Sequence, residues 1–301
     1  MQNWDGTKAF KQGAEALCFG DLVERDKQYN ARASVADFDT TISEYTTLSR
    51  KADATVPAVR NLRYGLAANE RLDIFPTVLA NQPAPLFIFI HGGYWRGQTK
   101  EDSSMLALHL PQAGIAVCTI EYTLLPGSTL PETIRQVRAA VAWLHRNAAQ
   151  YGLDANRFIV GGSSAGGHLA AMVAAEGWTQ EYGLPDDCIK GVVGLSGLYD
   201  LRPLCGTHIN AWLHLHEDQA WRVSPVCHLP RPGLPVFLTV GGLETDGFKV
   251  QTTAYENLCR EHGVKVTRHD MEQCNHFNLL VELTKADSPL TRAVHDMVAG
   301  L

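Results

Sequence analysis

The chain has 301 residues, of which 45% are hydrophobic and 19% charged, as in ordinary soluble globular enzymes. α/β folds of this length often form one domain, so we expect a single domain over residues 1–301. The formal net charge is −6 and no run of Lys or Arg occurs, which argues against nucleic acid as a partner.

The amino-terminal segment lacks the basic stretch and apolar core of a signal peptide. Apolar runs such as residues 86–90 are far too short to cross a bilayer. The seven cysteines show no Cys-x-x-Cys spacing, which is typical of free thiols in a reducing compartment. We therefore expect a cytoplasmic protein that acts on a small molecule and has no membrane partner; a homodimer is compatible with these features.

Short apolar runs alternate with amphipathic stretches from about residue 60 onward, which favours a mainly parallel sheet with helices on both faces. The predicted strands cover residues 61–67, 71–75, 85–90, 115–121, 158–161, 190–195, 235–240 and 265–270. The predicted helices cover residues 103–113, 131–151, 164–176, 246–262 and 288–300. Gly114 and Gly152 follow two of these helices, at the position where a left-handed residue commonly ends a helix.

Two segments depart from this alternation. Residues 1–55 carry mixed charges and no strand signal, so we expect a helical N-terminal cap that leans over the sheet edge. Residues 198–232 are rich in proline, histidine and tryptophan, and we expect them to form an insertion near the functional site.

Residues 162–166 read Gly-Ser-Ser-Ala-Gly and lie between a predicted strand and a predicted helix. A Gly-x-Ser-x-Gly turn at such a place exposes its central serine as a nucleophile, and the small residues avoid collision with neighbouring strands. The spacing selects Ser164 rather than Ser163. No Lys follows in the pattern of a phosphate-binding loop, so that alternative is excluded.

The sequence His91-Gly92-Gly93-Tyr94-Trp95 follows the predicted strand 85–90. Lipase-like hydrolases place a His-Gly-Gly motif here, and its backbone N–H groups stabilise the oxyanion of the reaction. The candidate donors are the N–H groups of Gly92, Gly93 and Tyr94, together with the N–H of Ala165, the residue after the nucleophile. We expect His91 to orient the loop rather than to act as a base.

The chain order of this fold is serine, then acid, then histidine. His276 follows the last predicted strand and is the candidate base. Glu244 and Asp246 both follow the strand 235–240. We favour Glu244 as the acid, whereas Asp246 has the alternative role of capping the next helix.

The loop at residues 91–95 together with residues 162–170 resembles the kynurenine formamidase (arylformamidase) branch of the α/β-hydrolases. That branch is close to the hormone-sensitive-lipase-like esterases. The likeness extends from about residue 60 to 280 and includes residues 64–65, 72–76, 196–201 and 275–277. The resemblance implies hydrolysis of N-formylkynurenine to kynurenine and formate, through Ser164 and His276 and without a cofactor. The family acid is often aspartate, whereas this chain has Glu244 at the corresponding place.

The aromatic residues near these motifs are candidates for substrate binding. We expect Tyr94 and Trp95, with Trp212 and Trp221, to wall a pocket for an aromatic leaving group, and Tyr94 to narrow the acyl side. Burial in the core is the alternative for Trp212 and Trp221.

Three other functions were weighed against this hypothesis. A small-acyl carboxylesterase would use the same triad. A binding module on a hydrolase scaffold requires loss of a triad member, and Ser164, His276 and an acid are all present. A metal site is disfavoured because no Cys-x-x-Cys frame accompanies the Cys and His residues of the insertion, which are Cys205, His208, His214, His216, Cys227 and His228.

Overall fold

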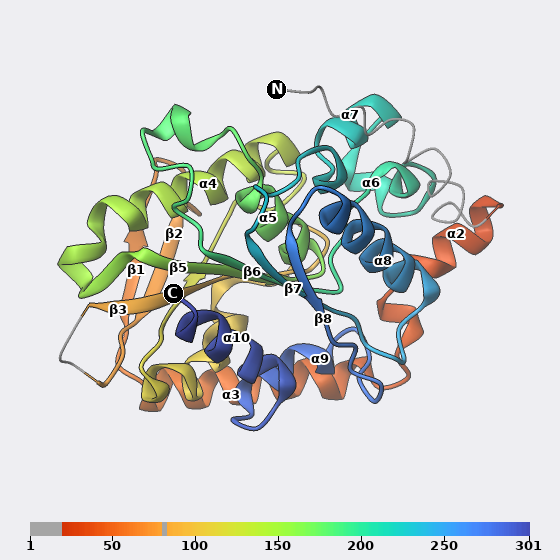
Figure 1. Cartoon of the computed structure of the whole chain (residues 1–301). Helices are drawn as coiled ribbons and strands as arrows, with labels where there is room; N and C mark the ends of the chain where they lie inside the picture. The colour runs from red at the N-terminus through yellow and green to blue at the C-terminus, as the bar shows by residue number, and fades with distance from the viewer. Residues whose placement is uncertain (1–19, 80–82) are drawn as a thin grey trace.

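The computed structural model describes residues 20–79 and 83–301, and within them eight strands form one sheet in the order β1-β2-β4-β3-β5-β6-β7-β8 (Figure 1). The β1–β2 and β2–β4 pairs are antiparallel, and the pairs that follow are parallel. The predicted α/β fold with a mainly parallel central sheet is therefore confirmed. The strands are β1 (Val59–Arg63), β2 (Arg71–Phe75), β3 (Ala84–Ile90), β4 (Ala116–Ile120), β5 (Leu153–Ser163), β6 (Gly191–Leu195), β7 (Pro235–Thr239) and β8 (Lys265–Arg268).

Helices flank this sheet. The α-helices in the described ranges are α2 (Leu22–Gln28), α3 (Phe38–Thr55), α4 (Leu130–Asn147), α5 (Ala165–Ala174), α6 (Asn210–Leu213), α7 (Glu217–Arg222), α8 (Asp246–Glu261), α9 (Asn278–Val281) and α10 (Pro289–Ala299). Short 3₁₀ helices connect them: η1 (Arg32–Ser34), η2 (Lys100–Leu108), η3 (Leu110–Ala113), η4 (Ala148–Tyr151), η5 (Thr179–Tyr182), η6 (Arg202–Gly206), η7 (Pro225–Cys227) and η8 (Glu282–Thr284). In these same ranges, no helix has both the length and the apolarity that a membrane span requires.

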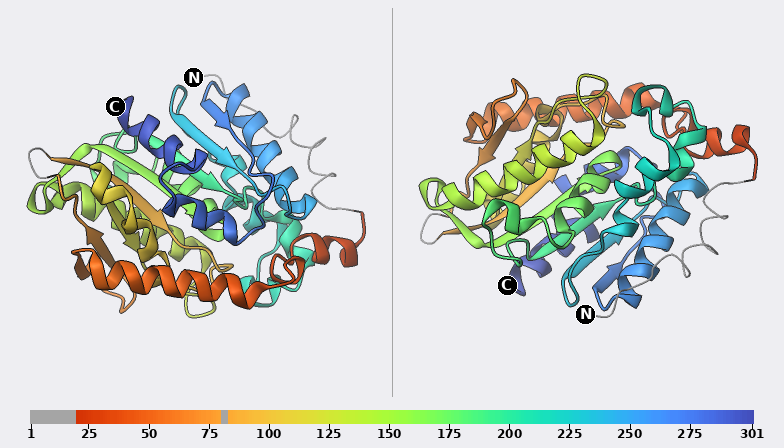
Figure 2. Two further views of the ribbon diagram at one scale, coloured as in Figure 1. Left: turned by 90° about the horizontal axis from the view of Figure 1, so that it is seen from below. Right: turned by 90° about the horizontal axis from the view of Figure 1, so that it is seen from above.

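The sheet is buried on both faces. Every residue of β3 is buried, and its side chains alternate between two apolar clusters because successive strand residues point to opposite faces. Leu86, Ile88 and Ile90 pack with residues of α4, α5 and α8. Phe87 and Phe89 pack with residues of α3, η2 and α10 on the opposite face. Figures 1 and 2 show these helices as two layers with the sheet between them.

Most predicted elements are found, with shifted ends. The first strand spans 59–63 instead of 61–67, because the chain turns back after Tyr64, whose N–H donates to the Glu70 carbonyl at 3.0 Å. The strand before Ser164 is longer than predicted, at 153–163. The segment 103–113 is not an α-helix but two 3₁₀ helices, η2 and η3, since His109 interrupts it at φ −122° and Pro111 lacks an N–H. Gly114 and Gly152 have φ of +89° and +67°, so both end their helices in the predicted left-handed conformation.

The N-terminal cap differs from its prediction. Residues 1–19 of the predicted cap lie outside the described residues. In the remainder, α3 does not lean over the sheet edge but runs along the face that α9 and α10 also cover (Figure 1). Its Tyr45 is buried in the apolar cluster of that face, and its Ser49 hydroxyl donates to the Asp102 carbonyl of η2 at 3.0 Å. The segment before this anchored helix lies beside the carboxyl end of β5, because its Asn30, Ala31 and Arg32 line the same cavity as Ser164.

Candidate active site

Ser164 lies at the junction of β5 and α5, where the backbone takes the strained values φ +57° and ψ −118°. A non-glycine residue persists in such a conformation only when its surroundings hold it there. The Ser164 N–H donates to the Leu195 carbonyl at 2.8 Å, which ties the turn to the end of β6. The sharp turn places the Ser164 side chain at the wall of a cavity.

The glycines of this turn are required by close backbone contacts. A Cβ atom at position 162 would lie 2.1 Å from the Gly166 carbonyl oxygen. A Cβ atom at position 166 would lie 2.0 Å from the Ile90 carbonyl oxygen. The sharp turn thus depends on both glycines, as the sequence pattern predicts.

His276 and Glu244 form a buried pair in the loops that follow β8 and β7. His276 Nδ1 lies 2.6 Å from Glu244 Oε2, and the Glu244 side chain is 0% exposed. Glu244 Oε1 accepts hydrogen bonds from Ser196 Oγ at 2.5 Å and from the Gly241 N–H at 2.7 Å. Three donors therefore hold the carboxylate, and its ionised form accepts all three bonds.

Asp246, the alternative acid, forms no hydrogen bond or ion pair with His276. Its side chain is 74% exposed, and its nearest cation is Lys249 at 4.0 Å. It lies in the first turn of α8, whereas Thr245 is the residue that precedes the helix, so the predicted capping role of Asp246 is also wrong. Of the two carboxylates, the structure brings only Glu244 to His276.

The loop after β3 contains four residues in the left-handed region, with φ of +84° at Gly93, +49° at Tyr94, +57° at Trp95 and +62° at Gln98. The Gly92 N–H donates to Gln98 Oε1 at 3.1 Å, so this group is already committed. The expectation that Gly92 supplies an oxyanion donor is therefore corrected. In the described ranges, no acceptor is bound to the N–H of Gly93, Tyr94 or Ala165, and these three remain as candidate donors.

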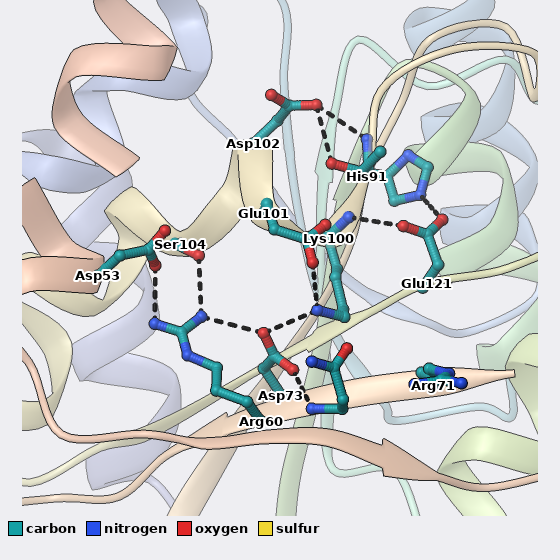
Figure 3. Close-up of polar contacts among 12 residues, drawn as sticks. Asp53, Arg60, Arg71, Asp73, His91, Lys100, Glu101, Asp102, Ser104 and Glu121 are labelled. Carbon is teal, nitrogen blue, oxygen red and sulfur yellow. Dashed lines mark hydrogen bonds and ion pairs between the residues drawn. The ribbon is translucent and has the colours of Figure 1, made fainter. Parts of the chain in front are cut away.

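The side chains of His91 and Glu121 contact each other at the start of this loop (Figure 3). His91 Nε2 lies 3.1 Å from Glu121 Oε1, and the His91 ring stacks on Tyr122 with centroids 4.3 Å apart. The Tyr122 hydroxyl donates to the carbonyls of His91 and Gly92, at 3.0 and 3.2 Å. These contacts place His91 in the orienting role that the sequence indicates.

A buried ion network continues from Glu121 to the outer strands (Figure 3). The Lys100 N–H donates to Glu121 Oε2 at 3.1 Å, and Lys100 Nζ lies 2.9 Å from Asp73 Oδ2. Asp73 is 0% exposed and also binds Arg60 at 3.0 Å. The network therefore pairs Arg60 of β1 and Lys100 of η2 with Asp73 of β2, and it reaches the oxyanion loop through Glu121.

Trp95 does not lie where the sequence analysis places it. Its side chain is fully buried, and its indole N–H donates to His168 Nδ1 at 3.3 Å. His168 Nε2 in turn lies 2.7 Å from the Val223 carbonyl, so the ring is neutral with its proton on Nε2. Burial lowers the pKa of His168 to about 4. Trp95 thus ties the oxyanion loop to α5 and is not a wall of the cavity.

The cavity beside Ser164 has a volume of about 730 Å³. It is lined by Gly92, Gly93, Tyr94, Ser164 and His276, so it contains both the serine and the histidine of the predicted triad. Apolar parts of the wall come from α3, the 91–98 loop, the 198–232 segment, the loop after β8 and α9; they include Phe38, Ile42, Tyr45, Trp212, Phe277 and Leu280.

The two tryptophans of the 198–232 segment have different positions. Trp212 lines the cavity, and its indole N–H donates to the Tyr94 carbonyl at 3.1 Å. Trp221 is not among the lining residues and stacks under Arg202 at 4.3 Å. The predicted wall therefore retains Tyr94 and Trp212, while the proposed contributions of Trp95 and Trp221 are wrong.

The Cys and His residues of the 198–232 segment are the candidate ligands of the alternative metal site. No group of three or more His, Cys, Asp or Glu side chains in the described ranges is arranged to hold a metal ion. His208 instead pairs with Asp26, at 2.7 Å from Nδ1, and His228 binds the Arg222 carbonyl through Nε2 at 2.7 Å. The six described cysteines are free thiols.

Comparison with known proteins adds family relationships to this geometry. Residues 72–241 match the family model BD-FAE. Kynurenine formamidases from Salmo salar and Danio rerio are each 31% identical to this chain, over 83% of this chain and 85% of those proteins. A crystal structure from a Silicibacter species, provisionally described as a thioesterase, is 28% identical and superposes with a TM-score of 0.76, over 90% of this chain and 98% of that one.

Proposed function

Because this chain belongs to the kynurenine formamidase branch of the α/β-hydrolases, we propose that it removes the formyl group from an aromatic amide of the N-formylkynurenine type. One observation carries the catalytic part of the proposal. The strained Ser164 and the buried Glu244–His276 pair occupy the loops that follow β5, β7 and β8 at one edge of the sheet, and Ser164 and His276 line one cavity.

The proposed reaction begins with Ser164. His276 keeps its proton on Nδ1, in a hydrogen bond to Glu244, which leaves Nε2 free to accept the Ser164 hydroxyl proton as Oγ attacks the formyl carbon. The carbonyl oxygen becomes an oxyanion, and the N–H groups of Gly93, Tyr94 and Ala165 are its proposed donors. A single lost oxyanion donor typically costs about 3–4 kcal/mol of transition-state stabilisation, so this loop contributes much of the rate.

Two stages complete the reaction after this tetrahedral intermediate has formed. The C–N bond breaks as His276 returns the proton to the amine nitrogen, and a formyl ester remains on Ser164 Oγ. Water attacks this ester and gives one proton to His276, which passes it to Ser164 Oγ and restores the hydroxyl. The product leaves as formic acid, which ionises to formate by releasing its proton to solvent. An aromatic amine is less basic than an alkyl amine. Cleavage of the C–N bond therefore competes well with expulsion of Ser164 Oγ, which would regenerate the substrate.

The cavity wall supports an aromatic leaving group. The Tyr94 and Trp212 rings lie edge to face with centroids 6.5 Å apart, and Phe277 contributes a third ring. The Tyr94 hydroxyl donates to the Tyr29 carbonyl, so that ring is held in place. We propose that the fixed Tyr94 ring narrows the part of the cavity that receives the acyl group, so that a formyl group fits better than a longer one. Tyr94→Ala is then expected to improve butyryl turnover relative to formyl turnover.

The test is a panel of formyl, acetyl and butyryl anilides with short nitrophenyl esters, measured as kcat/KM on wild type and Ser164→Ala. We expect turnover of the formyl anilide to exceed that of the longer anilides and to vanish with Ser164→Ala. Turnover of the esters without turnover of any formyl anilide would assign the chain as a small-acyl carboxylesterase instead.

A further inference from the structure

The substrate cavity holds a guanidinium that the proposed reaction does not use. Arg96 belongs to the oxyanion loop, lines the cavity with an exposed side chain, and has its N–H bound to the Gly93 carbonyl at 3.0 Å. Its Cζ lies 4.8 Å from the centre of the Trp212 ring. In the part of the chain that the structure describes, no carboxylate lies within ion-pair distance of Arg96.

The surface under Arg96 is fixed. The Trp212 indole N–H donates to the Tyr94 carbonyl at 3.1 Å, so the ring is attached to the oxyanion loop itself. The His208 ring meets Trp212 edge to face at 5.8 Å, and Asp26 holds His208 through both its backbone N–H and its ring. A guanidinium that stacks on a fixed indole keeps the N–H groups at its edge available for a bidentate acceptor.

The other charged side chains of the cavity are engaged elsewhere. Arg32 stacks over Phe38 at 4.6 Å and lies 3.9 Å from Asp39. Asp102 accepts bonds from the Thr99 N–H and hydroxyl, at 2.9 and 3.3 Å, as the cap of η2. Among the described cavity residues, Asp102 also lacks a cation, but its carboxylate is bound by Thr99. The guanidinium of Arg96 has neither an ion pair nor a hydrogen bond to another side chain in the described ranges.

We propose that Arg96 determines specificity by binding a carboxylate on the amine side of the substrate. The inference rests on the proposed function, because an N-formylkynurenine-type amide carries an amino-acid carboxylate on its aromatic amine. Arg96 follows the proposed oxyanion donors Gly93 and Tyr94 by only a few residues. A substrate whose formyl oxygen binds these N–H groups can therefore extend its amine side along Trp212 toward the guanidinium.

The experiment compares two formyl amides that differ only in charge, N-formylkynurenine and its α-carboxamide, by their kcat/KM ratio. We expect wild type to prefer the carboxylate by about 10- to 100-fold, the range of one charge-assisted hydrogen-bonded pair. Arg96→Met and Arg96→Gln are expected to bring the ratio close to one, mainly through KM, because a remote contact is made in the ground state and the transition state alike. Arg96→Lys should restore part of the preference.

Arg32→Met is the matched control, since it removes the other guanidinium of the cavity. The ratio is expected to stay near its wild-type value in this variant. No preference in wild type, a preference that survives both Arg96→Met and Arg96→Gln, or a loss of preference in Arg32→Met would each overturn the assignment to Arg96.

A second substrate pair separates this inference from the proposed function. The acetate esters of 3-hydroxybenzoic acid and 3-hydroxybenzamide place a carboxylate or a neutral amide on the leaving group. If neither formyl amide reacts but the esters show a preference that depends on Arg96, the formamidase proposal fails and the inference stands. If the formyl amides react with the same ratio in wild type and Arg96→Met, the formamidase proposal stands and the inference fails.

Discussion

Replacing Glu244 with glutamine tests the role of the buried acid with almost no change in shape. In the wild-type geometry, the His276 Nδ1 proton is held by Glu244 Oε2 at 2.6 Å, while Oε1 accepts bonds from Ser196 and the Gly241 N–H. A glutamine can keep its oxygen toward Ser196 and Gly241, but it then presents its NH₂ group to His276. The ring must respond by moving its proton to Nε2, which removes the base that Ser164 needs.

The expected loss follows from this change of tautomer. We expect kcat/KM to fall about 10³- to 10⁴-fold, equivalent to about 4–5.5 kcal/mol of transition-state stabilisation. The assay is hydrolysis of a neutral formyl anilide and of a short nitrophenyl ester, so that the result does not depend on the natural substrate. Thermal unfolding of Glu244→Gln should show a folded protein.

Asp246→Asn is the matched control, because its carboxylate is 74% exposed and contacts neither Ser164 nor His276. We expect its kcat/KM to stay within about twofold of wild type, since surface substitutions of this kind change energies by only ~0.5 kcal/mol. The reasoning is refuted if Glu244→Gln keeps more than a tenth of wild-type activity, or if Asp246→Asn loses as much as Glu244→Gln.

Further predictions concern the residues that support the site. Lys100→Met leaves buried Asp73 with one cation fewer, and urea unfolding should show that the free energy of unfolding falls by about 3 kcal/mol. A fall of less than about 1 kcal/mol would show that this ion pair does not stabilise the fold. Gln98→Ala leaves the Gly92 N–H without its acceptor, and we expect kcat to fall about tenfold on a short ester; an unchanged kcat would show that this bond does not position the loop. Burial lowers the pKa of His168 to about 4, whereas in the unfolded chain it titrates near 6.5. The unfolded chain binds the extra proton first as pH falls, so His168 should remove about 3 kcal/mol of unfolding free energy between pH 6.5 and 4. Urea unfolding measured across this pH range should show the loss in wild type but not in His168→Gln. The same dependence of unfolding free energy on pH in both proteins would contradict this explanation.

The parts of the fold and site that the sequence predicts are those that local pattern determines. The apolar run before residue 91, the glycines around Ser164 and the chain order of Ser164, Glu244 and His276 all depend on short segments in fixed positions. Parallel strands bring their carboxyl ends to one edge of the sheet, so predicting the strands also predicts that these loops meet.

What the sequence does not predict depends on partners that are distant along the chain. The indole of Trp95 is buried because it binds His168, which lies 73 residues later. The Gly92 N–H is unavailable because the Gln98 side chain folds back onto it. No periodicity or spacing encodes such side-chain contacts. The motif alone therefore predicts more oxyanion donors and more cavity-wall residues than the structure has.

The central claim is that Ser164 accepts a formyl group from an aromatic amide. The most direct measurement is the release of kynurenine and formate from N-formylkynurenine by wild type and by Ser164→Ala. We expect equal amounts of the two products from wild type and a rate lower by at least about 10³-fold in Ser164→Ala. No release by wild type that still hydrolyses short esters, or undiminished release by Ser164→Ala, would contradict the claim.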